Sequence, residues 1–439
     1  MFSVKVEQSP KEWRNWSGMV RSRPKQIVYP ASMEEVVSVV KTCAQEGRNI
    51  RVVGSGHSFT RLVQTDDMLV SLDLLQGITD VDLEAGTVEV WAGTKLKALG
   101  ELLFAKGFSQ ENLGDINTQS IAGALSTGTH GTGTSFGVLS TQVVGMTVVT
   151  ADGEVLECSA KSNADLFNAM RVSLGMLGII VKMRLRAVPA MTLRYKSNRI
   201  SVEECLANLD RFNRENRHFE FYVFPYADTA QVKMMNQTEE MTSGNNKWSY
   251  IKKMVVENGA FWLMSEGCRL YPKLCRPISR LSAQAVPNIS EAGESHRIFA
   301  TPRLVRFNEM EYNLPAEHLR EAVEEARASI ERNRFAVHFP IECRYSKGDD
   351  IWLSPAHGRD SAYIAVHMYK GMPHQEYFQE MERIFQRYGG RPHWGKMHTM
   401  SAAQLREAYP KWDDFLQLRA RLDPQGIFLN PYLTELIGG

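Results

Sequence analysis

Two glycine-rich segments of this chain each contain a histidine, where a phosphate-binding loop usually offers only backbone. Residues 51–60 read RVVGSGHSFT, in which a short apolar run leads into Gly-Ser-Gly and then His57. Residues 119–133 read QSIAGALSTGTHGTG and include His130, and residues 173–180, SLGMLGII, form a third glycine-rich segment. Glycines let backbone N–H groups approach an anion closely, and serine and threonine add hydroxyl donors. Singly, each segment is better explained by tight turns and close strand packing, but the three together predict a pyrophosphate site.

The segments match neither of the two common nucleotide-binding motifs. No GxGxxG opens a helix after the first predicted strand, and no GxxxxGK[ST] occurs in the chain. These absences disfavour a Rossmann dinucleotide site and a P-loop nucleotide hydrolase.

A second place for chemistry is the predicted strand in FPIECRY. Glu342 and Arg344 lie two residues apart there, so both side chains point to the same face of a sheet. A carboxylate beside a guanidinium on one face could hold a polyol. From the pattern alone, an ordinary surface ion pair on an exposed strand is the favoured explanation of the two residues.

The first third of the chain alternates helix and strand signals. Ser32 and Glu35 predict a capping box before a helix that Gly47 ends. IRVVG, MLVSLDLL, ITDVDLEAGTVEVWAG and VVGMTVVTADGEVLE read as strands, with a hairpin turn at Asp152 and Gly153. This alternation predicts an α+β domain with mixed strands.

The pattern of apolar and polar residues changes after Pro189. HFEFYVFPY, LVRFNEMEYNL, FAVHFPIECRY and SAYIAVHMY alternate apolar and polar residues, as half-buried antiparallel strands do. Helices are predicted over 201–215 and 315–332. We expect a second domain, a sheet that helices cover on one face, and a return to short loops and a helix after Gly390.

Composition limits the partners. The 439 residues are 43% hydrophobic and 23% charged, and Lys+Arg 51 against Asp+Glu 50 leaves a formal charge of +1. The chain has no run of five like charges, which would indicate binding to nucleic acid or to an anionic membrane. Small molecules are therefore the expected partners. The N-terminus lacks the apolar core of a signal peptide, and no run of about 18 apolar residues occurs. A cytoplasmic protein is expected.

The cysteines are scattered, with no CxxC and no short cluster of cysteine and histidine; they are Cys43, Cys158, Cys205, Cys268, Cys275 and Cys343. This spacing predicts reduced thiols, no disulfide framework and no metal site.

Five motifs in order carry a family resemblance: GSGHSFT, NLGDINTQSIAGALSTGTHGTG, FPIECRYSKGDDIWLSP, RPHWGKMH and the terminal FLNPY. Over nearly the whole chain, the sequence resembles the aldonolactone and alditol oxidoreductases of the vanillyl-alcohol-oxidase flavoprotein superfamily. The resemblance implies a two-subdomain FAD-binding domain of the vanillyl-alcohol-oxidase (PCMH) type. Residues 1–190 and 391–439 would form this domain, and residues 191–390 would form an inserted antiparallel-sheet cap domain.

The resemblance also implies the residues that contact FAD. His57 occupies the place of the histidine that, in this family, bonds covalently to the 8α-methyl group of the flavin. The alternative is a histidine that donates to the pyrophosphate or caps the turn. The complete expected FAD-contacting set is Arg51, Val53, Gly54, Ser55, Gly56, His57, Ser58, Gly114, Ser120, Gly123, Ser126, Thr127, Gly128, His130, Gly131, Gly178, Ile180 and Lys396.

Five residues match positions that line the active site of relatives. By resemblance, Glu342 would bind substrate hydroxyls, and Arg344 and Lys396 would hold the reacting oxygen and the charge near flavin N1. His367 and Lys396 would share the hydroxyl proton, and Ser120 would place its hydroxyl near the substrate. His393 and His398 flank Lys396 and are expected only to shape its loop.

The implied activity is oxidation of the CH–OH group of an aldono-1,4-lactone of the L-gulono or D-arabinono type. Hydride would pass to flavin N5 and electrons then to O₂, giving hydrogen peroxide. The alternatives are an alditol oxidase acting on xylitol or sorbitol, and a lactone dehydrogenase with another acceptor. A sugar-binding module that lost flavin chemistry is the non-enzymatic alternative. A monomer or weak homo-oligomer is expected.

Oxygen reactivity is tied to one glycine. By resemblance, Gly114 lies beside the flavin position that reacts with O₂, where relatives that exclude oxygen can carry alanine. Gly114 would leave the path open, which favours an oxidase. Alternatively, this glycine only satisfies a turn with positive φ after Leu113.

Overall fold

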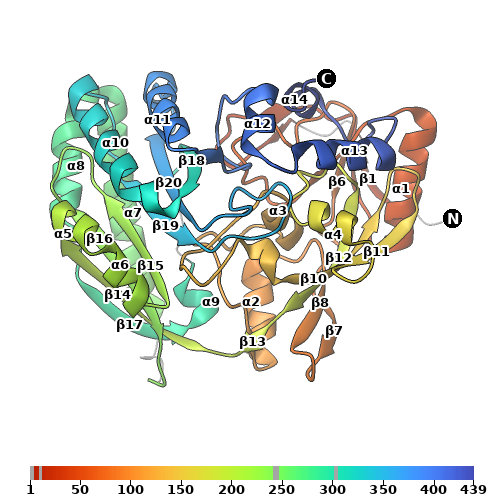
Figure 1. Cartoon of the computed structure of the whole chain (residues 1–439), viewed down its shortest axis with the longest axis horizontal. Coiled ribbons are helices and arrows are strands. Elements are labelled where there is room, and N and C mark those ends of the chain that lie inside the picture. Colours follow the sequence, from red (N-terminus) through yellow and green to blue (C-terminus); the bar gives the residue numbers. More distant parts are fainter. Residues whose placement is uncertain (1–3, 9–11, 241–246, 301–304) are drawn as a thin grey trace.

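The structure is a computed structural model that describes residues 4–8, 12–240, 247–300 and 305–439. Figure 1 shows two halves side by side, one with the N-terminal strands and one with a large sheet flanked by helices. Both chain ends lie in the same half. The predicted α+β fold with an antiparallel-sheet domain inserted in the chain is confirmed.

The first sheet has the order β1-β4-β6-β5, with β4, β6 and β5 parallel and β1 antiparallel to β4. Its strands are β1 (Lys5–Gln8), β4 (Gln26–Tyr29), β5 (Ile50–Val53) and β6 (Met68–Ser71). Helix α1 (Met33–Glu46) joins the parallel strands β4 and β5, as such a crossover requires. The end of β5 leads directly into the loop with His57.

Only half of the predicted capping box forms at the start of α1. The Ser32 hydroxyl accepts a hydrogen bond from the Glu35 amide at 3.2 Å. The Glu35 carboxylate accepts from the Ala31 amide at 2.7 Å, one residue before the amide that the motif predicts. Gly47 ends the helix in the left-handed conformation, with φ 64°.

The second sheet is antiparallel throughout, in the order β11-β10-β12-β8-β7. Its strands are β7 (Ile78–Asp82), β8 (Thr87–Trp91), β10 (Val143–Val149), β11 (Val155–Ser159) and β12 (Ile179–Arg186). The predicted hairpin turn joins β10 and β11, and its Gly153 has φ 78°. The helical segments of this region are α2 (Leu96–Ala105), α3 (Ile121–Ser126), η1 (Leu139–Gln142) and α4 (Ala164–Met170).

The inserted sheet is antiparallel, in the order β17-β14-β16-β15-β19-β20-β18-β21. Its strands are β14 (Thr192–Ile200), β15 (His218–Val223), β16 (Ala230–Gln237), β17 (Ile289–Glu294), β18 (Phe307–Pro315), β19 (Ile341–Ser346), β20 (Ser361–Tyr369) and β21 (Arg391–Pro392). The prediction of half-buried strands is wrong at its centre, where β18, β19 and β20 are buried on both faces. The charged side chains of these strands are buried because they pair with one another.

Helices flank the inserted sheet (Figure 1). They are α5 (Val202–Ala207), α6 (Leu209–Glu215), α7 (Lys247–Leu270), η2 (Pro272–Leu274), α8 (Cys275–Gln284), α9 (Ser295–Ile298), η3 (Ala316–His318), α10 (Leu319–Asn333) and α11 (Gln375–Arg387). The single helix predicted over 201–215 is instead two, because the chain leaves helical geometry at Asn208, with φ −119° and ψ 16°.

The C-terminal segment returns to the first half as α12 (Ala402–Ala408), α13 (Trp412–Leu422) and α14 (Pro431–Leu436). Its apolar residues join the same buried cluster as those of α1 and β6. The Asn430 side chain donates to the carbonyls of Arg61 and Gln64 at 2.9 and 2.8 Å, and the Ile50 amide donates to Ile427 at 2.7 Å. The two ends of the chain therefore build one core.

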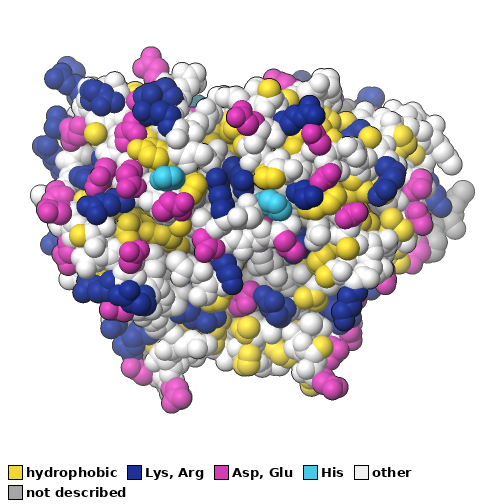
Figure 2. Space-filling view, viewed as in Figure 1, with side chains coloured by type: hydrophobic (Ala, Val, Ile, Leu, Met, Phe, Trp, Pro, Cys, Tyr) yellow, Lys and Arg dark blue, Asp and Glu magenta, His cyan; other side chains and the backbone are white. Residues whose placement is uncertain are grey.

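Two short strand pairs complete the fold: β2 (Trp13–Arg14) with β3 (Arg21–Ser22), and β9 (Phe108–Ser109) with β13 (Val188–Pro189). Across the described parts of the chain, no helix is both long and apolar enough to cross a membrane. Basic and acidic side chains are interspersed over the face drawn in Figure 2.

Candidate active site

A cavity of about 980 Å³ lies where the loops after β5, β6 and β8 meet α3 and the segment before β12. All three glycine-rich segments contribute to its walls. Thirteen members of the predicted FAD-contacting set line it: Arg51, Val53, Gly54, Ser55, Gly56, His57, Ser58, Ser120, Gly123, Ser126, Thr127, Gly178 and Ile180. Gly128 and Gly131 instead pack close to Pro355 and Asn112.

Two glycines in these walls have neighbours that leave no room for a side chain. A Cβ atom at Gly54 would lie 2.2 Å from the Ser120 hydroxyl oxygen. A Cβ atom at Gly93 would lie 1.9 Å from the Leu72 carbonyl oxygen. The missing side chains therefore let the loops and α3 close around the cavity, with backbone forming much of its surface.

The loop after β5 is suited to an anion. Among the residues that the structure describes, the amides of residues 55 to 58 donate no backbone–backbone hydrogen bond. Buried or half-buried amides of this kind need an acceptor, and a phosphate supplies several. The cavity's donor set thus fits the FAD that the sequence predicts.

Arg51 lines this cavity, but its guanidinium group is already engaged. Its three nitrogens donate to the backbone carbonyls of Leu62, Leu174, Gly175 and Phe428. Burial lowers the pKa of Arg51 to about 10. Arg51 thus ties β5 to the third glycine segment and to the C-terminal segment, which shapes the cavity from behind.

His57 lies between the large cavity and a second one of about 580 Å³ and lines both. The Thr118 hydroxyl lies 2.8 Å from its Nε2, and the ring stacks on Trp16 with centroids 5.8 Å apart. Burial, followed by the charges of Lys396 and Lys95, lowers the pKa of His57 to about 4. The imidazole is therefore neutral at physiological pH, the form in which a ring nitrogen is nucleophilic.

The second cavity has walls from both halves of the molecule. Its lining combines residues of the N-terminal half with charged residues of the inserted sheet and the loop after it: Trp16, His57, Ser58, Phe59, Gly114, Asp115, Ile116, Gln119, Thr127, Thr129, His130, Glu311, Arg344, His393, Gly395 and Lys396. His57, Ser58, Gln119 and Thr127 line both cavities, so the two spaces lie side by side.

Strand register puts the charged side chains on one face of the inserted sheet. Glu220 of β15 pairs with Arg344 of β19, and Glu309 of β18 pairs with His367 of β20. Glu342 and Glu311, from opposite sides, both pair with residue 365, an alanine. Because side chains alternate along a strand, all of these positions share one face.

Arg344 is held by three carboxylates. Its Nε donates to Glu220 at 2.7 Å, its Nη2 pairs with Glu342, and Asp115 lies 3.6 Å from Nη2. Burial acts to lower the pKa of Arg344, but the surrounding carboxylates outweigh it and raise that pKa. The predicted pair of Glu342 and Arg344 is thus buried, and the alternative of an exposed surface pair is wrong.

Lys396 reaches the same face from the loop after β21. Its Nζ lies 2.5 Å from a Glu309 oxygen and 3.8 Å from a Glu311 oxygen. Burial acts to lower the pKa of Lys396, but the two carboxylates outweigh it, so that pKa is raised. Burial acts in turn to raise the pKa of Glu309, but Lys396 and His367 lower it to about 2. Lys396 is therefore an ammonium ion that faces the second cavity.

The other two predicted catalytic residues, His367 and Ser120, lie in different surroundings. His367 Nε2 is 3.5 Å from Glu309 and 3.9 Å from Glu342, so the histidine contacts the carboxylates that hold Lys396 and Arg344. Ser120 lines the larger cavity, next to Gly54. Lys396, Arg344, Glu342 and His367 are thus brought together, and Ser120 lies in the cofactor cavity.

Two further histidines line the second cavity. His130 Nε2 lies 2.9 Å from Glu311, and its Nδ1 lies 2.8 Å from the Gly131 carbonyl, so both nitrogens face acceptors. Burial lowers the pKa of His393 to about 3, and its Nδ1 accepts from the Gly395 amide at 3.0 Å. The neutral His393 ring therefore carries its hydrogen on Nε2.

Gly114 lines the second cavity and does not have the positive φ that the alternative explanation requires. A Cβ atom there would lie 3.0 Å from the His130 carbonyl oxygen and 3.7 Å from the Thr129 methyl group. The turn explanation for this glycine is therefore wrong, and an alanine would need only a small local shift.

Comparisons with known families agree with this geometry. A family model described as D-arabinono-1,4-lactone oxidase matches residues 183–436, more than half of the chain. The chain belongs to the D-arabinono-1,4-lactone oxidase family. A second model, described as FAD binding domain, matches residues 24–159. The protein is an FAD-dependent oxidoreductase, as the sequence predicts, and the sugar-binding module without flavin chemistry is disfavoured.

Relatives align over almost their whole length. An L-gulono-1,4-lactone dehydrogenase of Mycobacterium tuberculosis is 43% identical over 426 residues, which are 97% of this chain and 99% of that protein. The L-gulonolactone oxidase of Mus musculus is 33% identical over 434 residues, 97% of this chain and 98% of that protein. A crystal structure of cholesterol oxidase from B. sterolicum has a TM-score of 0.82 at 19% identity, covering 99% of this chain and 97% of that one. This last similarity supports the fold.

Sequence reasoning missed several residues of this lactone oxidase family site. Glu309 and Glu311 alternate along FNEMEYNLP in the same way as Glu342 and Arg344, so their shared face could have been predicted. Asp115 and Trp16 carry no such signal, because each is a single residue in an irregular segment. His393 was expected only to shape a loop, yet it lines the second cavity.

Proposed function

We propose that this protein oxidises the CH–OH group of an aldono-1,4-lactone of the L-gulono or D-arabinono type. The observation that supports the proposal is that a cavity with glycine-rich walls lies beside a second cavity lined by Lys396 and Arg344. The names of the relatives supply the substrate class. A lactone offers oxygen atoms to both cations and a C–H bond beside the junction at His57.

Bound FAD supplies the acceptor for the hydride that leaves the substrate carbon. Lys396 donates a hydrogen bond to the reacting oxygen, and its ammonium charge stabilises negative charge that develops nearby. Arg344 binds a second substrate oxygen, and Glu342 fixes its fork in place. His367, in contact with Glu309 and Glu342, takes the hydroxyl proton through this carboxylate layer.

Substrate rates test this proposal directly. The purified protein is assayed at equal concentrations of L-gulono-, D-arabinono- and L-galactono-1,4-lactone, xylitol and sorbitol, with flavin bleaching as the readout. We expect kcat/KM for at least one lactone to exceed that for both alditols by roughly tenfold or more. Faster bleaching by xylitol or sorbitol makes the protein an alditol oxidase, and a purified protein without flavin absorbance overturns the proposal.

His57 is proposed to form a covalent bond to FAD. Its neutral ring and its place between the cavities support this bond, and Thr118 at Nε2 leaves Nδ1 as the bonding atom. Protein denatured in acid should retain yellow flavin in the pellet, and His57→Ala should release it while still folding. If the wild-type protein releases all its flavin on denaturation, the proposed covalent bond between His57 and FAD is wrong.

O₂ is proposed as the electron acceptor, because Gly114 lines the second cavity and has no side chain that could block the approach of O₂. The name of the relative at 43% identity favours the other candidate, a dehydrogenase. The rate at which the reduced enzyme reoxidises in air-saturated buffer decides between them. Fast reoxidation of the wild-type enzyme that becomes slower in Gly114→Ala supports a role of Gly114 in admitting O₂. Slow reoxidation with rapid turnover on an artificial dye makes the protein a dehydrogenase.

Two finer predictions accompany this proposal. The chain is expected to work in the cytoplasm as a monomer or weak homo-oligomer. Size-exclusion chromatography with light scattering measures the second expectation, since a stable dimer at low micromolar concentration contradicts it.

A further inference from the structure

Three side chains that can bind a metal meet inside the inserted domain, and none of them lines either cavity of the candidate active site. Cys268 lies near the end of α7, Cys275 begins α8, and His338 precedes β19. All three are buried, with 0%, 1% and 0% of their surfaces exposed. Cys275 and His338 are 63 residues apart in sequence, so no spacing motif reveals the group.

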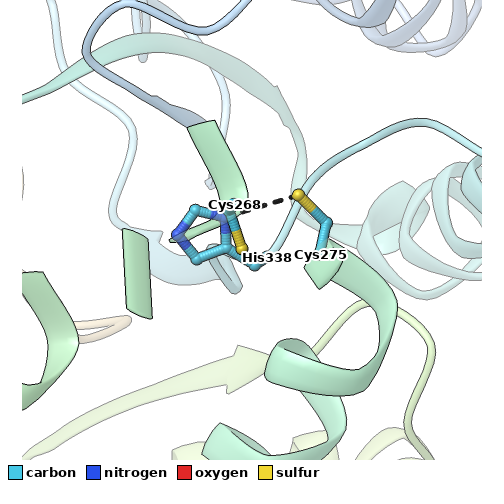
Figure 3. A group of neighbouring side chains, drawn as sticks. All are labelled: Cys268, Cys275 and His338. Atoms are coloured by element: carbon cyan, nitrogen blue, oxygen red, sulfur yellow. Dashed lines mark hydrogen bonds between the residues drawn. The ribbon is translucent and has the colours of Figure 1, made fainter. Parts of the chain in front are cut away.

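The three ligand atoms converge on one point. The two sulfur atoms and one imidazole nitrogen all lie within 4.8 Å of one another. Cys275 Sγ is 3.9 Å from His338 Nδ1, and Figure 3 shows the sulfur facing the ring along this line. Tetrahedral zinc, with bonds of about 2.3 Å to sulfur and 2.0 Å to nitrogen, holds such atoms roughly 3.5 Å apart. Movements of about an ångström or less would therefore close the site around an ion.

The surroundings fix His338 in the orientation that a metal requires. The Ser265 hydroxyl lies 2.9 Å from Nε2, which leaves Nδ1 directed at Cys275. A hydrogen-bond partner on the second ring nitrogen is the usual arrangement for a histidine that ligates a metal. Phe261 and Phe339 lie beside the same ring, with centroids 5.8 and 4.9 Å away. These rings give the site apolar walls on one side.

We propose that Cys268, Cys275 and His338 form a structural zinc site, with water as the fourth ligand. On binding, the two S–H bonds break, two Zn–S bonds and one Zn–N bond form, and two protons leave to solvent. Two thiolates neutralise Zn²⁺, which suits a fully buried site. Cu⁺, the other thiophilic candidate, would leave a net negative charge in the same apolar surroundings.

This inference is independent of the lactone chemistry. The ion would join α7 and α8 to the loop that starts β19, four residues before Glu342. It would therefore tie the start of the strand that carries Glu342 and Arg344 to these two helices. The sequence prediction that the chain has no metal site would then be wrong.

Metal analysis of the flavin-bound protein tests the site. Wild-type protein, incubated with zinc and passed through a desalting column, should retain roughly one zinc per chain. Cys268→Ser, Cys275→Ser and His338→Gln should each retain at least about tenfold less. Cys205→Ala, which removes a buried thiol elsewhere in the same domain, should retain the wild-type amount.

A second measurement needs no variant, so a folding defect cannot obscure the result. Cobalt added to chelator-treated wild-type protein should give the long-wavelength bands of tetrahedral thiolate coordination, beyond the flavin absorbance. Wild-type protein that binds neither ion overturns the proposal, as does equal zinc in all variants. Copper in place of zinc overturns the metal assignment. A chain mass lower by two hydrogen atoms, mapped to Cys268 and Cys275, shows a disulfide and overturns the site.

Discussion

At the scale of single residues, the charge of Lys396 is set by two carboxylates of one strand. Glu309 and Glu311 lie 2.5 and 3.8 Å from its Nζ and keep it protonated despite burial. A lysine with a raised pKa is a poor proton acceptor at neutral pH, so it serves better as a hydrogen-bond donor and a fixed positive charge. Lys396 is therefore not expected to share the substrate hydroxyl proton with His367. His367 alone is expected to accept that proton.

We therefore expect Lys396→Met to lower kcat much more than it raises KM. Loss of a charge used mainly in the transition state should reduce kcat by on the order of 10²-fold. Stopped-flow flavin reduction measures this step, with the exposed Lys106→Met as the matched control. Wild-type flavin reduction in Lys396→Met would remove the residue from catalysis.

Glu309→Gln should change the pH dependence of the same step. The carboxylate raises the pKa of Lys396, so its removal lets the ammonium lose its proton at lower pH. The basic limb of the kcat profile should then move down by roughly one to two pH units. Glu324→Gln, on the exposed surface of α10, should leave the limb in place. An unmoved limb in Glu309→Gln would mean that another group sets it.

How much of this network the sequence predicts depends on distance along the chain. Glu342 and Arg344 share a face because they are two residues apart, and this geometry needs only strand periodicity. Lys396 meets Glu309 through the order of strands in the sheet, and that order arises from packing of whole elements. No local pattern predicts it.

At the scale of elements, the loop after β5 and the start of α3 close on each other at one point. Gly54 and the Ser120 hydroxyl leave no space for a methyl group between them. Local glycine patterns predicted that these segments meet around a cofactor. They did not predict α7 or the split at Asn208, because neither has a clear apolar period or a strong stop residue.

Gly54→Ala should accordingly lower FAD occupancy. The added Cβ, 2.2 Å from the Ser120 oxygen, forces the loop away from α3, and overpacking of this kind costs roughly 1–3 kcal/mol. In a His57→Ala background, where no covalent bond to that residue can hold the flavin, flavin absorbance per chain should fall about tenfold or more under dilute conditions. Gly145→Ala, where a Cβ has ordinary contacts, is the control, and Ser120→Gly should restore FAD to Gly54→Ala. No loss in Gly54→Ala would contradict the close packing.

At the scale of the whole molecule, acid should weaken the fold through its buried histidines. Burial lowers the pKa of His218 and His398 to about 4 and that of His393 to about 3, from 6.5 when exposed. The unfolded chain binds more protons in this window, so their stabilisation is complete above pH 6.5 and is lost as pH falls toward 4. Asp349, whose pKa burial raises to about 6, acts in the opposite direction.

The net effect between pH 7 and 5 should be a loss of roughly 4 kcal/mol in the free energy of unfolding. Urea denaturation at a series of pH values, followed by tryptophan fluorescence, measures it. A denaturation midpoint that stays level across this range would mean that these histidines are not buried in their neutral form.

The joining of the two chain ends also fixes the order in which the protein can be completed during synthesis. The carbonyls of Ile427 and Phe428 accept from the Ile50 amide and from Arg51, and Asn430 closes the loop that follows His57. The cofactor cavity is therefore unfinished while the C-terminus is still inside the ribosome. The inserted domain, made later than most of the cofactor domain, can complete its own core first, which reverses the usual N-terminal order of folding. FAD would accordingly bind only after residues 427–430 have left the ribosome, and a ribosome stalled before that point would hold a colourless protein.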